Sequence, residues 1–287
     1  MKLIKSSFQI IEPTGYTIDD IYKSIELAGR VSHKSEDKIT ETSAKDFVGR
    51  MLNMKHLATC EFGTVYLCAN NMKNSAIDFY WQNPYSKEIW DNSMRYITTN
   101  YRVLIENNKL DCLKYLCEPT EYHHKRYTVK FICDRGILAE FTRHRAFSFM
   151  AESSRYNNYS KNKFNNELTF IQPNWAENTI NLTTQRVYDY LYNETYSDET
   201  ISPQDRFLMG LKVAEDIYLK LINSGWKAEQ ARNVLPLSLK TELYMCGFAE
   251  DWEKFFELRC ASNSHPQARE LAIPLREEFI KRGYMNG

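Results

Sequence analysis

The most informative stretch of the chain is residues 140–156, which read EFTRHRAFSFMAESSRY. It holds three arginines, one histidine and three serines beside apolar residues. Guanidinium groups as close as those of Arg143 and Arg145 repel each other unless an anion or a carboxylate neutralises them, so the run indicates a ligand that carries phosphate. A solvated turn is the alternative, because a bare Arg-His-Arg triplet recurs by chance.

The residues that follow the triplet complete a longer pattern. Residues 143–155 contain R-H-R, then seven residues, then S-x-R. This pattern resembles the signature of the flavin-dependent thymidylate synthases, and its fixed positions favour that family over a solvated turn. The family usually has an amide or an acidic residue among the positions that Met150 and Ala151 occupy in this chain.

A segment ahead of the motif resembles the family's H-x-S/T-x-x-E-H segment. It spans residues 56–62, HLATCEF, and matches that segment at His56 and Glu61. It departs from the family at Ala58 and Phe62.

Two segments beyond the motif extend the resemblance in the family's order. Residues 230–237, QARNVLPL, resemble A-R-x-x-L-P, and residues 255–259, FFELR, resemble F-x-x-L-R. The helical positions that hold flavin-contacting Asn and Arg in many relatives are occupied here by Phe248, Glu250 and Lys254. The adenine end of the flavin is therefore expected to bind differently in this chain.

The resemblance implies an α+β fold: a central, mostly antiparallel sheet flanked by helices, with additional C-terminal helices, assembling as a homotetramer. Apolar periodicity and end signals predict helices at residues 18–28 with Gly29 as the stop, from Ser43 as N-cap toward His56, from Pro203 to Gly225, and at residues 249–261 and 266–281. Strands are predicted at residues 62–68 and 127–133. We expect one domain over residues 1–287, with a polar excursion at about 160–202.

The resemblance also assigns roles to individual residues. The expected catalytic residues are Arg259, which would assist ionisation at N3 of uracil, Ser153, Arg155 and His56. The expected substrate contacts are Glu140, Arg143, Ala151, Glu152, Ser153, Ser154, Arg155, Arg232 and Arg259. The expected cofactor contacts are Arg143, His144, Arg145, Glu61, Ala58 and His265. No metal site is expected.

Several of these residues also have a plain structural interpretation. Taken alone, Arg232 would be a surface helix residue, Arg259 would complement a helix dipole and His265 would cap a helix. Glu140 replaces a common glutamine, and a carboxylate only accepts hydrogen bonds where an amide can also donate them.

The activity that the resemblance implies is reductive methylation of dUMP to dTMP with methylenetetrahydrofolate, FAD and NADPH. A thiol route needs a cysteine in an electropositive pocket, and none of the seven cysteines has the Pro-Cys-His neighbourhood of the thiol-dependent thymidylate synthases. Guanidinium groups at the pyrimidine edge offer another way to raise electron density at C5. Two alternatives stay open: methylation of another pyrimidine nucleotide such as UMP, and a non-catalytic module that binds nucleotide phosphates.

Composition limits the partners. Lysine plus arginine and aspartate plus glutamate number 37 each, so the net charge of zero argues against a general attraction for nucleic acid. The seven cysteines lack a C-x-x-C pair, which predicts reduced thiols and a cytoplasmic protein. No stretch approaches the roughly 20 apolar residues of a membrane span. An anionic ligand must therefore be held by a local cluster of charges.

Overall fold

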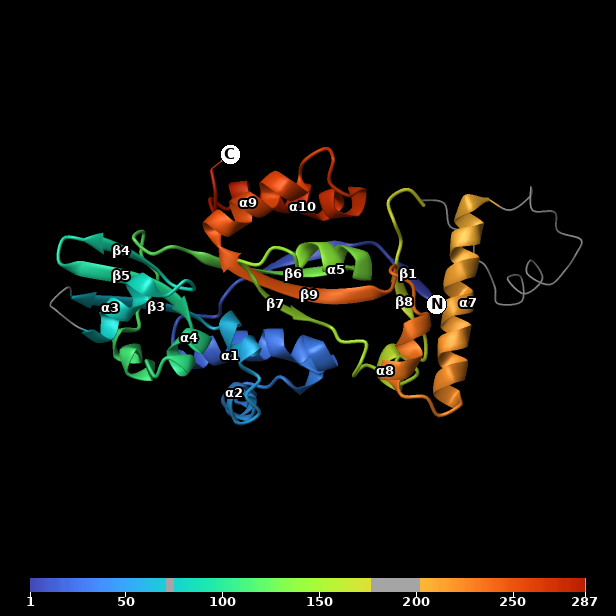
Figure 1. The fold of residues 1–287 in the computed structure, drawn as a ribbon, viewed down its shortest axis with the longest axis horizontal. Coiled ribbons are helices and arrows are strands. Elements are labelled where there is room, and N and C mark those ends of the chain that lie inside the picture. Colours follow the sequence, from blue (N-terminus) through green and yellow to red (C-terminus); the bar gives the residue numbers. More distant parts are fainter. Residues whose placement is uncertain (71–74, 177–201, 287) are drawn as a thin grey trace, which may run out of the picture.

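The computed structural model describes residues 1–70, 75–176 and 202–286 (Figure 1). Its central sheet has the strand order β2-β6-β9-β7, and every neighbouring pair is antiparallel. The strands are β2 (Ser7–Ile11), β6 (Arg126–Asp134), β7 (Ser148–Ala151) and β9 (Lys240–Phe248). Helices lie on both faces of this sheet, so the predicted α+β fold with an antiparallel central sheet is confirmed.

Alternation of side chains along β6 and β9 gives the central sheet two different faces. Phe131 lies opposite Leu243 and Val129 lies opposite Met245, and all four side chains are fully buried on one face. Three helices cover this face: α5 (Arg135–Phe141), α9 (Ala249–Arg259) and α10 (Pro266–Lys281). Tyr244 of β9 belongs to a second buried cluster with residues of α1 (Ile18–Arg30), which covers the opposite face.

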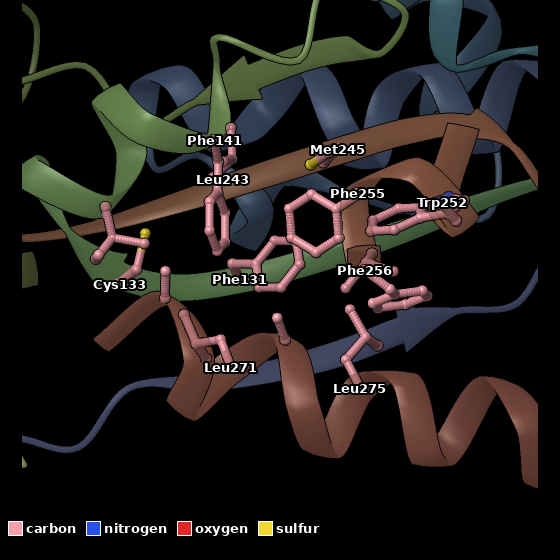
Figure 2. Packing of buried hydrophobic residues seen from close by; sticks show 14 of the residues in the cluster. Phe131, Cys133, Phe141, Leu243, Met245, Trp252, Phe255, Phe256, Leu271 and Leu275 are labelled. Carbon is pink, nitrogen blue, oxygen red and sulfur yellow. The ribbon is translucent and has the colours of Figure 1, made fainter. Parts of the chain in front are cut away.

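Aromatic rings fill the space between α9 and the sheet (Figure 2). The ring centroid of Phe131 lies 5.1 Å from that of Phe141, which in turn lies 5.0 Å from that of Phe255. Both pairs meet edge to face, an arrangement that adds about 0.5–1.5 kcal/mol to the burial of the rings. Since Phe141 ends α5 and Phe255 belongs to α9, the contact holds the chain just before the R-H-R triplet against α9.

The helices α1 and α2 (Ser43–Asn53) pack together on the far side of the sheet from α9. Thr17 and Asp20 form a capping box at the start of α1. The prediction that Gly29 ends this helix is wrong, because α1 continues to Arg30. A Cβ atom at Gly29 would lie 2.6 Å from the Phe47 ring, so the glycine permits close packing against α2.

The predicted bounds of α2 also need correction. Its N-cap is Thr42, not Ser43, and the Ser43 hydroxyl donates to the carboxylate of Glu26 on α1 at 2.8 Å. The helix ends at Asn53 and does not run toward His56.

A second antiparallel sheet, with the order β3-β5-β4, lies at one end of the molecule (Figure 1). Its strands are β3 (Thr64–Asn70), β4 (Lys87–Asp91) and β5 (Met94–Asn100), and they adjoin α3 (Ser75–Gln82) and α4 (Tyr101–Glu106). The strand predicted at residues 62–68 is β3, which starts later because Leu57–Phe62 form the 3-10 helix η3. Val65, Ile97 and Leu104 belong to a buried cluster of this region.

A parallel pair, β1 (Lys2–Ile4) with β8 (Thr169–Ile171), lies at the other end beside α7 (Pro203–Asn223). Tyr218 and Leu211 of α7 share a buried cluster with Phe170 of β8. As predicted, α7 starts after Ser202, whose hydroxyl oxygen accepts from the amide of Asp205 at 3.0 Å. The predicted polar excursion thus carries β8 in residues 160–176, while residues 177–201 lie outside the described residues.

The remaining elements are short connections. They are η1 (Val31–His33), η2 (Glu36–Lys38), η4 (Leu110–Tyr115), η5 (Asn162–Phe164), α8 (Ala228–Ala231) and η7 (Arg232–Val234). The helix predicted at residues 249–261 is α9, which ends at Arg259, two residues before the predicted end. The helix predicted at residues 266–281 is α10, and its bounds agree with the prediction. Within residues 1–70, 75–176 and 202–286, none of the helices combines the length and the apolar character that crossing a bilayer requires.

Leu243 of β9 is fully buried beneath α9 and α10, so truncating its side chain should destabilise the fold strongly. We expect Leu243→Ala to lower the free energy of unfolding by about 2–5 kcal/mol, because the change leaves a cavity in the core. The matched control is Leu237→Ala, since Leu237 is 71% exposed; its effect should stay within about 0.5 kcal/mol. Urea denaturation measures both values, and equal losses in the two variants would contradict the assignment of this core.

Candidate functional site

The R-H-R triplet and the end of α9 meet in space, although 115 residues separate His144 from Arg259. The guanidinium of Arg259 donates from Nε to His144 Nε2 at 2.9 Å. It also donates from Nη1 to Glu140 Oε2 at 2.7 Å and from Nη2 to the Glu140 carbonyl oxygen at 2.6 Å. Three predicted site residues are therefore joined by direct hydrogen bonds.

The electrostatics of this cluster keep the imidazole neutral. Burial, together with the positive charges of Arg259 and Arg143, lowers the pKa of His144 to about 4. At neutral pH its Nε2 can therefore accept the hydrogen bond from Arg259. Burial also lowers the pKa of Arg259, against the opposing effect of the Glu140 carboxylate, but a guanidinium stays charged at physiological pH.

A hollow of about 400 Å³ opens beside the cluster. It is lined by Arg143, His144, Leu258, Arg259, Asn263 and Ser264. Arg143 is exposed and forms no ion pair with a described residue, so one of the two guanidinium charges lacks a carboxylate partner. The Ser264 hydroxyl is buried and has no hydrogen-bond partner among the described residues. Such an arrangement can bind an anionic, polar ligand.

Two further predicted residues, Glu61 and Arg145, face a different cavity of about 480 Å³. Glu61 accepts from Arg102 Nη1 at 2.6 Å, and its carbonyl oxygen accepts from Arg126 Nη1 at 3.1 Å. Arg145 is exposed and forms no ion pair with a described residue. Phe248 lines the same cavity. The cavity thus brings residues of the second sheet next to the R-H-R triplet.

The S-x-R part of the motif lies in a third place, after the end of β7. Ser153 donates its backbone N–H to the Ser32 carbonyl at 3.1 Å, and its hydroxyl oxygen accepts from the Arg155 amide at 3.2 Å. The Arg155 side chain is 57% exposed, and its Nε pairs with Glu229 at 2.9 Å. Glu229 belongs to α8, and this helix ends at the residue before the exposed Arg232. Arg155 is therefore held beside the QARNVLPL segment, with Ser154 half-buried between it and Ser153.

Glu152, a predicted substrate contact, lies among internal ion pairs. Its side chain is 1% exposed, and its carboxylate accepts from Lys240 at 2.8 Å and from the Tyr159 hydroxyl at 3.3 Å. Lys240 also pairs with Glu242, so the carboxylate of Glu152 belongs to a network of internal ion pairs. Glu152 also lines a cavity of about 250 Å³ together with Lys34 and Lys240, and its contact with the substrate stays a prediction.

The other predicted residues lie apart from these groups. His56 and Ala58 are exposed around the start of η3, and Ala151 is half-buried in β7. His265 caps α10, where its Nδ1 accepts from the Gln267 amide at 3.3 Å, so the capping interpretation is confirmed. Within the described ranges, no group of three or more His, Cys, Asp or Glu side chains is arranged to hold a metal ion.

Four residues that line these two sites were not predicted from the sequence. They are Arg102 and Arg126 in the cavity of about 480 Å³, and Asn263 and Ser264 in the hollow of about 400 Å³. Arg102 and Arg126 stand in ordinary helix and strand patterns with no motif around them. Asn263 and Ser264 lie in the turn between α9 and α10, which the sequence marks only as polar. Their positions become visible only once the chain is folded.

Comparison with known protein families identifies the family of this chain. Residues 111–282 match the family model described as thymidylate synthase complementing protein, Thy1. The chain belongs to this Thy1 family. The resemblance drawn from the sequence is thereby confirmed.

Curated relatives of the Thy1 chain include viral and bacterial proteins. It is 28% identical over 154 residues to a probable flavin-dependent thymidylate synthase of Paramecium bursaria Chlorella virus 1. It is 25% identical over 159 residues to a flavin-dependent thymidylate synthase of Synechocystis sp.. Each match covers 54% of this chain and 66% of the relative, so the chain spans just under two thirds of their length.

A solved structure is also similar to the Thy1 chain. It is the UMP/dUMP methylase PolB from Streptomyces cacaoi bound with 5-Br dUMP. The TM-score is 0.44 at 18% sequence identity, with 98% of this chain and 93% of the other covered.

The neutral state of His144 can be tested by NMR titration of its imidazole. We expect a midpoint near 4 and an upward shift in Arg259→Ala, because that variant removes a positive charge that disfavours protonation. Since the unfolded chain would bind this proton near pH 6.5, the free energy of unfolding should fall as the pH drops from about 6.5 toward 4. A wild-type midpoint near 6.5 would contradict the burial and charge of this site.

Proposed function

We propose that this Thy1 protein is a flavin-dependent thymidylate synthase, which methylates dUMP to dTMP with methylenetetrahydrofolate as carbon donor, FAD as redox mediator and NADPH as reductant. The observation that carries the proposal is the hydrogen-bonded cluster of Arg259, His144 and Glu140 beside the polar hollow. It unites the R-H-R triplet with the F-x-x-L-R segment, the two parts that the proposed chemistry needs at the nucleobase.

The role proposed for Arg259 is electrostatic. Uracil becomes reactive at C5 when its ring carries more negative charge, and a fixed guanidinium at the ring edge favours that form. Arg259 is bound to protein through one donor on each of its three nitrogens, which leaves two N–H groups for a ligand. The neighbouring Cys260 does not offer a thiolate, because burial raises the pKa of its thiol. These features support a route without a cysteine nucleophile.

The cavity that holds Glu61 and Arg145 fits a phosphate-bearing flavin. Its volume of about 480 Å³ lies within the roughly 300–1,000 Å³ of small-molecule sites. Arg145 and Arg126 bring positive charge there, and Phe248 offers an aromatic face. A bound reduced FAD would supply the reducing equivalents of the reaction. The protein's task there is to bind and orient the cofactor and to exclude water.

We also propose a homotetramer with active sites shared between subunits. The site residues of one chain fall into separate groups: the Arg259 cluster, the larger cavity, and the Arg155–Glu229 pair. Arg143, Arg145 and Arg232 are exposed, which leaves them accessible to a ligand or to a neighbouring subunit. If groups from neighbouring subunits lie side by side in the tetramer, together they would complete a site for nucleotide, folate and flavin.

UMP is the alternative substrate that deserves a direct test. Met150 and Ala151, where the family usually has an amide or an acidic residue, are both half-buried in β7. Release of tritium from C5-labelled dUMP and UMP compares the two nucleotides in one assay. Faster release from UMP would replace dUMP as the proposed substrate, and absence of release from either would favour a non-catalytic phosphate-binding module.

Arg259→Ala should lower the rate of dTMP formation by about 10²- to 10³-fold, as expected for loss of a charge-stabilising donor. The matched control is Arg276→Ala on α10, because Arg276 is exposed and lies outside the proposed site. Circular dichroism should show that both variants keep their helices. Unchanged turnover in Arg259→Ala would remove this residue from the reaction.

Glu140→Gln should strengthen the binding of dUMP severalfold. The change removes the negative charge that neutralises Arg259 and keeps an oxygen that can accept its hydrogen bond. Calorimetric titration with dUMP measures the difference, and Glu257→Gln on α9 serves as a control for loss of one exposed carboxylate. Weaker binding in Glu140→Gln would mean that the carboxylate itself contacts the nucleotide.

A further inference from the structure

One fully buried amide joins the S-x-R part of the motif to a turn that is distant in sequence. It belongs to Asn157, two residues after the motif ends. Its Nδ2 donates to the Ser32 carbonyl oxygen at 3.1 Å and to the Ser153 carbonyl oxygen at 3.0 Å. Ser32 lies in η1, 125 residues ahead of Asn157. The amide therefore connects η1 to the turn that follows β7.

A cation fixes the orientation of this amide. The Lys163 ammonium donates to Asn157 Oδ1 at 3.2 Å. It also donates to the carbonyl oxygens of His33 and Lys34, at 2.9 and 3.4 Å. A flipped amide would turn its NH₂ group toward the ammonium and its oxygen toward two carbonyl oxygens, so only one orientation agrees with these contacts. Both N–H donors and the oxygen of the buried amide are thus hydrogen-bonded.

The same contacts anchor the turn that presents Ser153 and Arg155. Besides Asn157 Nδ2, the Ser153 carbonyl oxygen accepts from the backbone N–H groups of Tyr156 at 3.3 Å and Asn157 at 3.1 Å. The Ser32 carbonyl oxygen accepts from the Ser153 N–H and from Asn157 Nδ2, both at 3.1 Å. Residues 153–157 therefore form a turn that is bonded at both ends to the same carbonyl group of η1.

Ring contacts extend this connection to the Arg155 side chain. The His33 imidazole stacks on the Tyr156 ring, with the centroids 4.4 Å apart. The Arg155 guanidinium also lies over the Tyr156 ring, with its Cζ 5.3 Å from the centroid. Because His33 is the residue after Ser32, the hydrogen bond from Asn157 also fixes the imidazole on which Tyr156 packs.

We propose that Asn157 is a positioning residue for the nucleotide site, because its two amide donors hold Ser153 and Arg155 in the arrangement that binds dUMP. The inference rests on the proposed function, which gives both residues a role at the nucleotide. A turn without such anchors would lose conformational entropy when a ligand ordered it. The amide orders the turn before the ligand binds, so that loss does not reduce the affinity.

Asn157→Asp tests this role, because the change keeps the shape of the side chain and replaces both amide donors by an oxygen that only accepts. That oxygen would face the two carbonyl oxygens, so we expect dUMP to bind about tenfold more weakly or worse, as measured by calorimetric titration. The control is Ser202→Ala, which removes the N-cap of α7 and lowers the melting temperature from a position outside this turn. Its affinity for dUMP should equal that of the wild type.

A double-mutant cycle separates positioning from a general loss of stability. If Asn157 acts through Arg155, then Asn157→Asp should weaken dUMP much less in an Arg155→Ala background than in the wild-type background. The reason is that the arrangement held by the amide has already lost its cation in that background. Equal losses in the two backgrounds, or wild-type affinity in Asn157→Asp, would overturn the inference.

Lys163→Gln carries the test if thermal melting shows that Asn157→Asp does not fold. This change removes the ammonium that orients the amide, so dUMP should bind severalfold more weakly, and an unchanged affinity would overturn the inference. Binding is also measured separately from turnover. A wild-type protein that binds dUMP with the expected cycle but forms no dTMP would overturn the proposed function and leave the role of Asn157 standing. A protein that binds neither dUMP nor UMP would overturn both.

Discussion

The contact between Phe141 and Phe255 is the constraint on which the geometry of the site depends. One ring ends α5 and the other lies in the middle of α9, and both are fully buried against β6. Because buried rings cannot shift without opening a cavity, the backbone before the triplet and the last turn of α9 keep a fixed separation. That separation lets the Arg259 guanidinium reach both Glu140 and His144.

Burial beside this aromatic core also sets the charge state of the site. The imidazole of His144 lies 5.1 Å from the Phe255 ring, centroid to centroid, and next to two guanidinium groups. Apolar surroundings and positive neighbours both disfavour an imidazolium, so the side chain accepts a hydrogen bond at neutral pH. The core therefore controls the chemistry of the polar cluster as well as its position.

The second sheet and the elements next to it bring arginines from outside the motif to the larger cavity. Arg102 follows β5 and reaches Glu61, while Arg126 starts β6 and bonds the carbonyl of the same residue. Glu61 thus connects α4, next to the second sheet, with the first residue of β6 in the central sheet. A residue recognised from a short family segment has its neighbours in two distant parts of the chain.

The sequence by itself determined the arginine-rich motif and, through the resemblance that this motif carries, the family and the α+β class. Local periodicity and end signals also predicted the helix α10 with its His265 cap. The sequence did not reveal that Gly29 serves helix packing, since that role depends on the Phe47 ring from another helix. Only the tertiary structure decided which charges meet: Arg259 with Glu140, Arg155 with Glu229, and Glu152 with Lys240 in the interior. Ion pairs form between side chains brought together by core packing, and spacing along the chain carries no record of those distances.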